Sequence, residues 1–179
     1  MIKHLANIPQ EMTQYNQWVN WVSKESRGRP VKIPIHPYED RYAKVNDPGT
    51  WGTFEDVVAK ALASDKKQLG IGFVFTDTDP FIGIDLDKCV GWISGEPIPS
   101  PYATKILTLL RSYTEISPSG HGLHIIVKGN IDLHWNKMDG VEIYTTLRYF
   151  TITGRVLCAK PIRDCTKELR KLNSALWAL

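Results

Sequence analysis

An apolar run that ends in two acids is the feature that most constrains how this chain can fold. Residues 81–87 are Phe-Ile-Gly-Ile-Asp-Leu-Asp, which predicts a buried strand with carboxylates at its end. Strand side chains alternate between faces, so Asp85 and Asp87 are expected on the same face, about 7 Å apart along the chain. Two like charges this close repel unless a cation lies between them, and divalent ions such as Mg²⁺ favour carboxylate oxygens. The pair therefore predicts a cation site at a strand end.

A third acid is expected on another strand of the same sheet. Glu142 lies between Val141 and Ile143, and both neighbours are strong strand formers. Its carboxylate is long enough to ligate the same divalent ions. Together, Glu142 and the two aspartates supply the acids of a two-metal site for nucleotidyl transfer.

A segment rich in serine and glycine, residues 117–124, is Ser-Pro-Ser-Gly-His-Gly-Leu-His. Its hydroxyls are suited to binding a phosphate, and Gly120 and Gly122 let backbone N–H groups approach an anion closely. His124 begins the next expected strand, where its ring could donate to a phosphate oxygen. Arg148 follows the Glu142 strand and could pair with the same phosphates through two hydrogen bonds. The segment therefore predicts a phosphate-binding turn beside the acids.

Composition indicates a single globular domain without a membrane segment. The 179 residues suffice to bury a core, and the net charge of +3 permits a polyanionic partner without requiring one. No apolar run approaches the ~20 residues of a membrane helix, and the first ten residues lack a signal-peptide core. A cytoplasmic location is therefore expected. The three cysteines lack CxxC spacing and are expected to be buried free thiols: Cys89, Cys158 and Cys165.

The apolar spacing predicts an α+β fold with a mostly antiparallel sheet covered by helices on one face. Turns at 77–80 and between 144 and 149 are expected to close hairpins, and 92–99 is expected to be a loop. His4, His36 and His134 are expected at the surface or in loops. Helices are expected from Thr53, from Ser100, and over 162–179 as an amphipathic C-terminal helix. The expected strands cover residues 18–22, 31–35, 69–76, 81–87, 113–116, 123–127, 141–144 and 149–153.

These motifs resemble the archaeo-eukaryotic primase superfamily, and specifically the primase-polymerase domains of phages and plasmids. That family carries a strand with Asp-x-Asp, a Ser/Gly segment ending in His, and a strand with a third acid. They correspond here to residues 84–87, 117–124 and 141–144. Glu142 stands where many members have Asp. The resemblance extends over residues 18–154 and includes the flanking segments 31–34, 47–51, 70–75, 112–116 and 148–154.

The resemblance implies an RRM-like sheet, with residues 1–179 forming one primase-polymerase catalytic domain. It implies a nucleotidyltransferase that adds dNTPs or NTPs to a 3′-hydroxyl, directed by a single-stranded DNA template with its primer. The implied setting is replication of a phage, plasmid or other mobile element, with a helicase or helical-bundle module as possible partner. Two Mg²⁺ or Mn²⁺ ions are implied, held by Asp85, Asp87 and Glu142. The implied nucleotide-binding residues are Lys32, Ser117, Ser119, Gly120, His124 and Arg148, with His121 at a variable position.

Two other classes remain open at this point. A rolling-circle replication initiator needs two histidines separated by one apolar residue, whereas His121 and His124 have two residues between them. It also needs a nucleophilic tyrosine on a helix, for which the clearest helices offer only Tyr102. A catalytically silent RRM-like module that binds nucleic acid would leave the three acids unexplained, because acids repel phosphates.

Overall fold

The computed structural model describes residues 4–64, 69–132, 137–138 and 140–177, with side chains described as far as Leu172. The chain forms two compact units. The first comprises Met1–Phe75 and Leu147–Gly154, and the second comprises Thr76–Thr146 and Arg155–Leu179.

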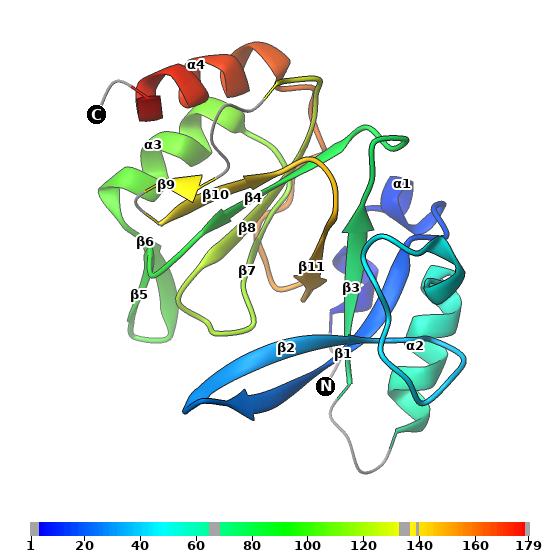
Figure 1. Cartoon of the computed structure of the whole chain (residues 1–179). Coiled ribbons are helices and arrows are strands. Elements are labelled where there is room, and N and C mark those ends of the chain that lie inside the picture. The colour runs from blue at the N-terminus through cyan, green and yellow to red at the C-terminus, as the bar shows by residue number, and fades with distance from the viewer. Residues whose placement is uncertain (1–3, 65–68, 133–136, 139, 178–179) are drawn as a thin grey trace. The chain divides into compact units, whose positions relative to one another are not determined.

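The first unit is built on a four-stranded sheet with the order β11-β3-β1-β2, in which all neighbours are antiparallel (Figure 1). Strand β2 lies at the edge, where Pro30 and Pro34 are tolerated although they cannot donate to a further strand. The elements are η1 (Leu5–Asn7), α1 (Gln10–Thr13), β1 (Trp18–Ser26), β2 (Arg29–Ile35), η2 (Pro48–Thr50), α2 (Phe54–Ala63), β3 (Gly70–Phe75) and β11 (Arg148–Ile152).

Edge-to-face aromatic contacts hold the core of this unit. The Trp18 ring lies 4.9 Å from Phe54 and 5.2 Å from Phe73, centroid to centroid, which joins α2 to the sheet. Helix α2 starts after Thr53, as predicted, and a capping box forms at this end. The Thr53 hydroxyl accepts from the Asp56 N–H, and the Asp56 carboxylate accepts from the Thr53 N–H.

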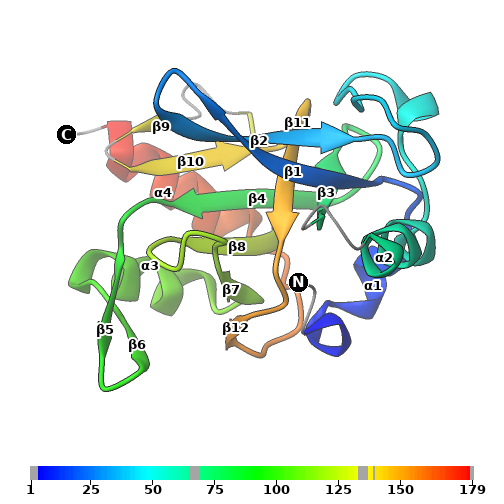
Figure 2. The same cartoon turned by 90° about the horizontal axis from the view of Figure 1, so that it is seen from below.

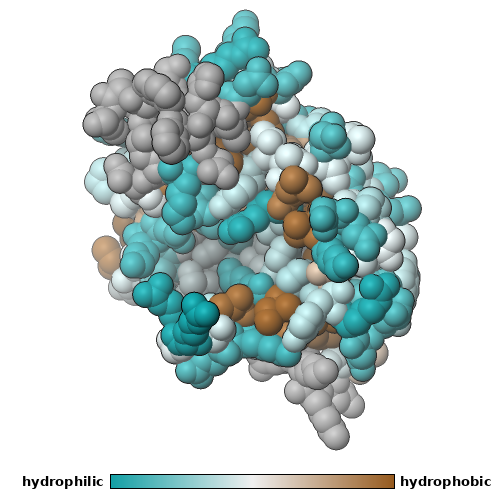
Figure 3. Space-filling model, in the orientation of Figure 1, coloured by the Kyte–Doolittle hydropathy of each residue, from teal (hydrophilic) through white to brown (hydrophobic). Residues whose placement is uncertain are grey.

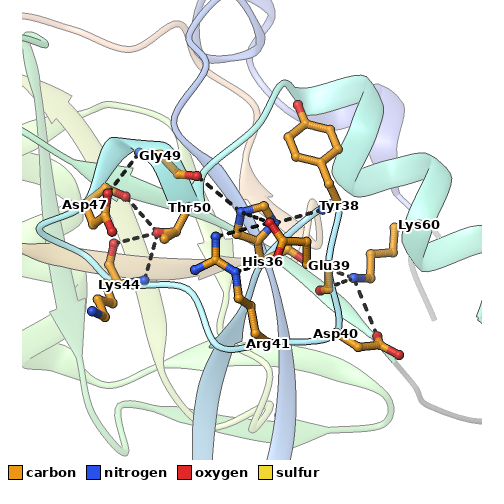
Figure 4. Close-up of polar contacts among 10 residues, drawn as sticks. All are labelled: His36, Tyr38, Glu39, Asp40, Arg41, Lys44, Asp47, Gly49, Thr50 and Lys60. Atoms are coloured by element: carbon orange, nitrogen blue, oxygen red, sulfur yellow. Dashed lines mark hydrogen bonds and ion pairs between the residues drawn. The ribbon is translucent and has the colours of Figure 1, made fainter.

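A polar network around His36 shapes the loop that follows β2 (Figure 4). His36 lies in a loop, as predicted, but only 3% of its surface is exposed. Its Nδ1 accepts from the Tyr38 N–H, so its Nε2 donates to the Gly49 carbonyl at 3.2 Å. The Lys60 ammonium donates to the carbonyls of His36 and Glu39, each at 2.8 Å. These contacts give His36 a structural role in holding the loop, which explains why its side chain is buried. His4 is exposed, and His134 lies outside the described residues.

The second unit is built on a six-stranded sheet with the order β12-β7-β8-β4-β10-β9, again with antiparallel neighbours. A separate hairpin, β5–β6, extends away from this sheet (Figure 2). The elements are β4 (Phe81–Leu86), β5 (Val90–Ile93), β6 (Glu96–Pro99), α3 (Pro101–Leu110), β7 (Thr114–Ile116), β8 (Leu123–Lys128), β9 (Lys137–Met138), β10 (Val141–Tyr144), β12 (Val156–Cys158) and α4 (Thr166–Trp177).

One face of the six-stranded sheet packs against α3 and α4, which lie together on that side (Figure 1). Ser100 caps α3, as predicted, by accepting from the Ala103 N–H. Because side chains alternate along each strand, the residues between the core positions project from the opposite face. The apolar core of this unit includes Ile82, Ile84, Leu86, Ala103, Ile106, Leu110, Leu123, Ile125, Val127, Val141, Ile143, Leu169 and Leu172.

The predicted α+β class with mostly antiparallel strands is confirmed, and so is the β7–β8 hairpin. Two predicted hairpins are wrong. Strands β3 and β4 belong to different sheets, because β4 pairs with β8 and β10. Strands β10 and β11 also belong to different sheets. The predicted loop at 92–99 is instead the β5–β6 hairpin, which turns at Ser94 and Gly95 with φ values of 51° and 85°.

The surface drawn in Figure 3 is largely hydrophilic, with apolar side chains in small separate groups. In the part of the chain that the structure describes, no helix has the length and apolar character to cross a bilayer. Cys89 and Cys165 are buried free thiols, as predicted, whereas Cys158 is only half-buried. Burial raises the pKa of Cys89 to about 11, so this thiol stays protonated and is a poor metal ligand.

Candidate active site

Five polar side chains form a row across five neighbouring strands of the six-stranded sheet. In the strand register, Glu115 on β7 pairs with His124 on β8, and His124 pairs with Asp85 on β4. Asp85 in turn pairs with Glu142 on β10, and Glu142 pairs with Lys137 on β9. Residues opposite one another in a register share a face. The row therefore lies on the face opposite α3 and α4. It contains three residues that the sequence predicts for the site: Asp85, His124 and Glu142.

Polar contacts join His124 to Glu115 and Asp85 in one part of this row and Lys137 to Glu142 in the other. His124 Nδ1 lies 3.4 Å from Glu115 Oε1, and His124 Nε2 lies 3.9 Å from Asp85 Oδ1. The Lys137 ammonium and the Tyr144 hydroxyl both donate to the Glu142 carboxylate. The Asp85 side chain is 27% exposed, compared with 4% for His124 and 7% for Glu142. Asp85 is thus the most accessible of these three groups.

The acids in this row provide the oxygen chemistry that a divalent cation requires. Asp85 and Glu142 are direct cross-strand partners, and Asp87 is exposed immediately after β4. Within the described ranges, no three acid, histidine or cysteine side chains form a ready-made metal cluster. The positive charge beside Glu142 comes from Lys137. Glu142 therefore already accommodates a cation, and the carboxylates fit a metal ion that would take the place of the ammonium.

The Ser/Gly turn between β7 and β8 is closed by its own hydrogen bonds. The Ser117 N–H donates to the Gly122 carbonyl and the Gly120 N–H donates to the Ser117 carbonyl, each at 2.9 Å. Gly120 has a φ of +80°, which glycine adopts without strain. The Ser117 and Ser119 hydroxyls lie 3.0 Å apart. The Ser119 hydroxyl also accepts from the His121 N–H at 3.2 Å, so the turn holds its own polar groups, and their binding of a phosphate remains a prediction.

The two histidines of this segment have different environments. His121 is exposed in the turn, where its Nδ1 lies 3.4 Å from the Val90 carbonyl. His124 is buried on β8 and contacts acids through both ring nitrogens. Only His124 belongs to the row, and its predicted role in nucleotide binding remains a prediction.

Gly122 marks a close approach between this turn and the acidic strand. A Cβ at this position would lie 2.8 Å from the Leu86 carbonyl oxygen and 3.0 Å from the Ser117 hydroxyl. We expect Gly122→Ala to displace the turn and to destabilise the fold by about 1–3 kcal/mol, as overpacking does. Urea unfolding measures this change. The matched control is Gly91→Ala, whose Cβ would have its nearest neighbour at 3.9 Å. Equal stability of the two variants would contradict the expectation.

Lys32 and Arg148, the other predicted phosphate contacts, lie in the first unit. Lys32 is exposed on β2, and its ammonium lies 3.5 Å from the Thr151 hydroxyl and 5.9 Å from the Trp21 ring centre. Arg148 is exposed at the start of β11. Their nucleotide-binding roles remain predictions.

The sequence reasoning missed Glu115 and Tyr113. The Tyr113 hydroxyl donates to Glu115 Oε2 at 3.0 Å, and both side chains are buried. Burial, with a further contribution from the charge of Glu115, raises the pKa of Tyr113, so the hydroxyl keeps its proton and donates. The available signal was an acid flanked by strand formers, Thr-Glu-Ile, which is the same pattern that identified Glu142.

The chain is similar in sequence to a primase-polymerase over most of its own length. No protein-family model matches the chain. The chain is 37% identical to a protein of Nitratiruptor phage NrS-1 described as a DNA primase-polymerase, in an alignment of 164 residues that covers 88% of the chain. This match confirms the resemblance to phage primase-polymerases that the sequence motifs predict. The aligned region spans about a fifth, 21%, of that relative's length.

Proposed function

We propose that this chain catalyses DNA-templated addition of nucleotides to a 3′-hydroxyl during replication of a phage, plasmid or other mobile element. The observation that carries the proposal is the cross-strand pair of Asp85 and Glu142, flanked by His124 on the same face of the sheet. The similarity to a DNA primase-polymerase supports the choice of reaction.

Each residue that the sequence predicts for the site has a role in this proposal. Asp85, Asp87 and Glu142 would hold two Mg²⁺ or Mn²⁺ ions. When bound, such ions neutralise charge on the transferring phosphate and make the attacking hydroxyl more acidic. Ser117, Ser119 and His124 would bind the incoming triphosphate, with Gly120 shaping the turn. Lys32 and Arg148 would contribute further phosphate contacts.

The two alternative classes receive less support. A rolling-circle nuclease would need His121 and His124 to converge on one metal, but their Nδ1 atoms contact Val90 and Glu115, respectively. A silent nucleic-acid-binding module would not need acids side by side on neighbouring strands, since these repel phosphates. Asp85 and Glu142 occupy such positions.

The test of the proposed function is nucleotide incorporation on single-stranded DNA, with and without an annealed primer, in Mg²⁺ or Mn²⁺. We expect metal-dependent extension of the primer in an order set by the template. Extension should exceed synthesis on bare template, because starting a strand requires two nucleotides to be held without a duplex. Binding of DNA without any incorporation in either metal would favour the silent module, and cleavage of the template would favour the nuclease.

The turn end of the β1–β2 hairpin provides a surface suited to the template. Strand β3 pairs with β1 only over Trp18–Trp21, so residues 22–33 extend past it (Figure 1). Residues 24–32 are exposed and carry four basic side chains and one acid, which gives +3. This equals the net charge of the whole chain, +3. We infer that this hairpin end grips template phosphates.

The double variant Arg27→Ala/Arg29→Ala tests this surface, because it removes two exposed charges at the hairpin turn. For single strands, each lost phosphate contact lowers the slope of log affinity against log salt by about 0.7. Fluorescence anisotropy with labelled single-stranded DNA should therefore show weaker binding and a slope reduced by about 1.4. The control, Lys105→Ala/Lys160→Ala, removes the same charge elsewhere. Equal losses in both variants would indicate a general charge effect and would overturn the assignment.

A further inference from the structure

The two ring nitrogens of His124 face two different acids. Nδ1 lies 3.4 Å from Glu115 Oε1, and Nε2 lies 3.9 Å from Asp85 Oδ1. Because Glu115 and Asp85 belong to the strands on either side of β8, the imidazole is aligned along the row. An imidazole alone on a strand could reverse its ring and exchange the nitrogen positions, so the orientation needs a cause.

Glu115 has the properties required to fix that orientation. Its side chain is fully buried, with 0% exposed, and a buried carboxylate is costly unless it is hydrogen-bonded. Its Oε2 accepts from the Tyr113 hydroxyl and its Oε1 faces His124. An ionised carboxylate only accepts hydrogen bonds. A proton on His124 must therefore reside on Nδ1 for this contact to form, and this leaves Nε2 facing Asp85.

We propose that Glu115 is a positioning residue: held by Tyr113, it keeps a proton on His124 Nδ1 and directs Nε2 toward the nucleotide at the Asp85 side of the row. Histidines elsewhere are oriented in this way by a carboxylate behind the ring. The effect on nucleotide addition rests on the proposed function. The orientation of the ring does not.

The direct test is to record the ¹⁵N chemical shifts of the His124 ring in the metal-free protein. We expect Nδ1 to be protonated in the wild-type chain. The variant Tyr113→Phe/Glu115→Leu removes the hydroxyl and the carboxylate together, so neither is left buried without the other, and thermal unfolding checks that the fold is kept. In this variant, we expect the proton to move to Nε2. Wild-type Nδ1 without a proton, or an unchanged proton position in the variant, would overturn the proposal.

Two further measurements separate positioning from structural support. Tyr113→Phe alone should lower stability and yet keep Nδ1 protonated, because Glu115 remains.

In the incorporation assay, Tyr113→Phe/Glu115→Leu should lower kcat/KM by about tenfold to a hundredfold, the effect typical of a lost orienting carboxylate. The same change added to His124→Ala should cause no further loss. An additive loss would show that Glu115 acts independently of His124. If the wild-type chain incorporates no nucleotide, the proposed function fails, while the ring shifts still decide the orientation.

Discussion

Asp85→Ala is expected to reduce nucleotide incorporation at least about a thousandfold, corresponding to roughly 4 kcal/mol of lost transition-state stabilisation. Asp85 lies at the centre of the polar row, between His124 and Glu142, and it is the most accessible of the three. Its loss would remove one oxygen ligand from the proposed metal site. Because its side chain is partly exposed, truncation should leave the core intact. Labelled-nucleotide incorporation measures the effect, and thermal unfolding checks the fold.

Asp77→Ala is the matched control for this experiment. Asp77 is an exposed acid in the turn before β4, outside the polar row. Its replacement removes the same charge from the same unit and should leave incorporation within about twofold, as is usual for surface changes. If Asp85→Ala retained substantial activity with unchanged metal dependence, Asp85 would not be a metal ligand.

His124→Ala is expected to reduce nucleotide incorporation by one to three orders of magnitude. The estimate corresponds to about 2–4 kcal/mol for lost hydrogen bonds to charged groups. His124 is buried, and Glu115 and Asp85 flank it on either side. Its removal would cost a contact with the triphosphate in the proposed site, so KM for the nucleotide should rise. Steady-state kinetics at several nucleotide concentrations measure both kcat and KM.

His121→Ala serves as the comparison. His121 is exposed between two glycines and contacts the Val90 carbonyl, so its loss should change incorporation far less. A greater loss from His121→Ala than from His124→Ala would reverse the assignment of the two histidines.

Much of the site could be predicted because strand alternation is a local property. The two-residue period predicts that alternate residues share a face, and the register places Asp85, His124 and Glu142 in one row. Helix starts at Thr53 and Ser100 were predictable for the same reason, since a cap depends on residues close in sequence.

Strand partners were less predictable because pairing is not local. The segments around 77–80 have the composition of a hairpin, yet β3 and β4 pair in different sheets. The same error affected β10 and β11. The side chains of an apolar strand do not specify which other strand pairs with it. For the same reason Glu115 was missed: its importance comes from lying opposite His124, which only the register of β7 and β8 shows.

The central claim is that Asp85, Asp87 and Glu142 bind the catalytic metal. It is tested most directly by adding Mn²⁺ to the ¹⁵N-labelled chain. Bound Mn²⁺ broadens the resonances of nearby nuclei, independently of any nucleotide chemistry. We expect the strongest broadening at the amides of Asp85, Asp87 and Glu142. In Asp85→Ala, we expect this selective broadening to be absent. Broadening centred elsewhere, or the same pattern in Asp85→Ala, would contradict the claim.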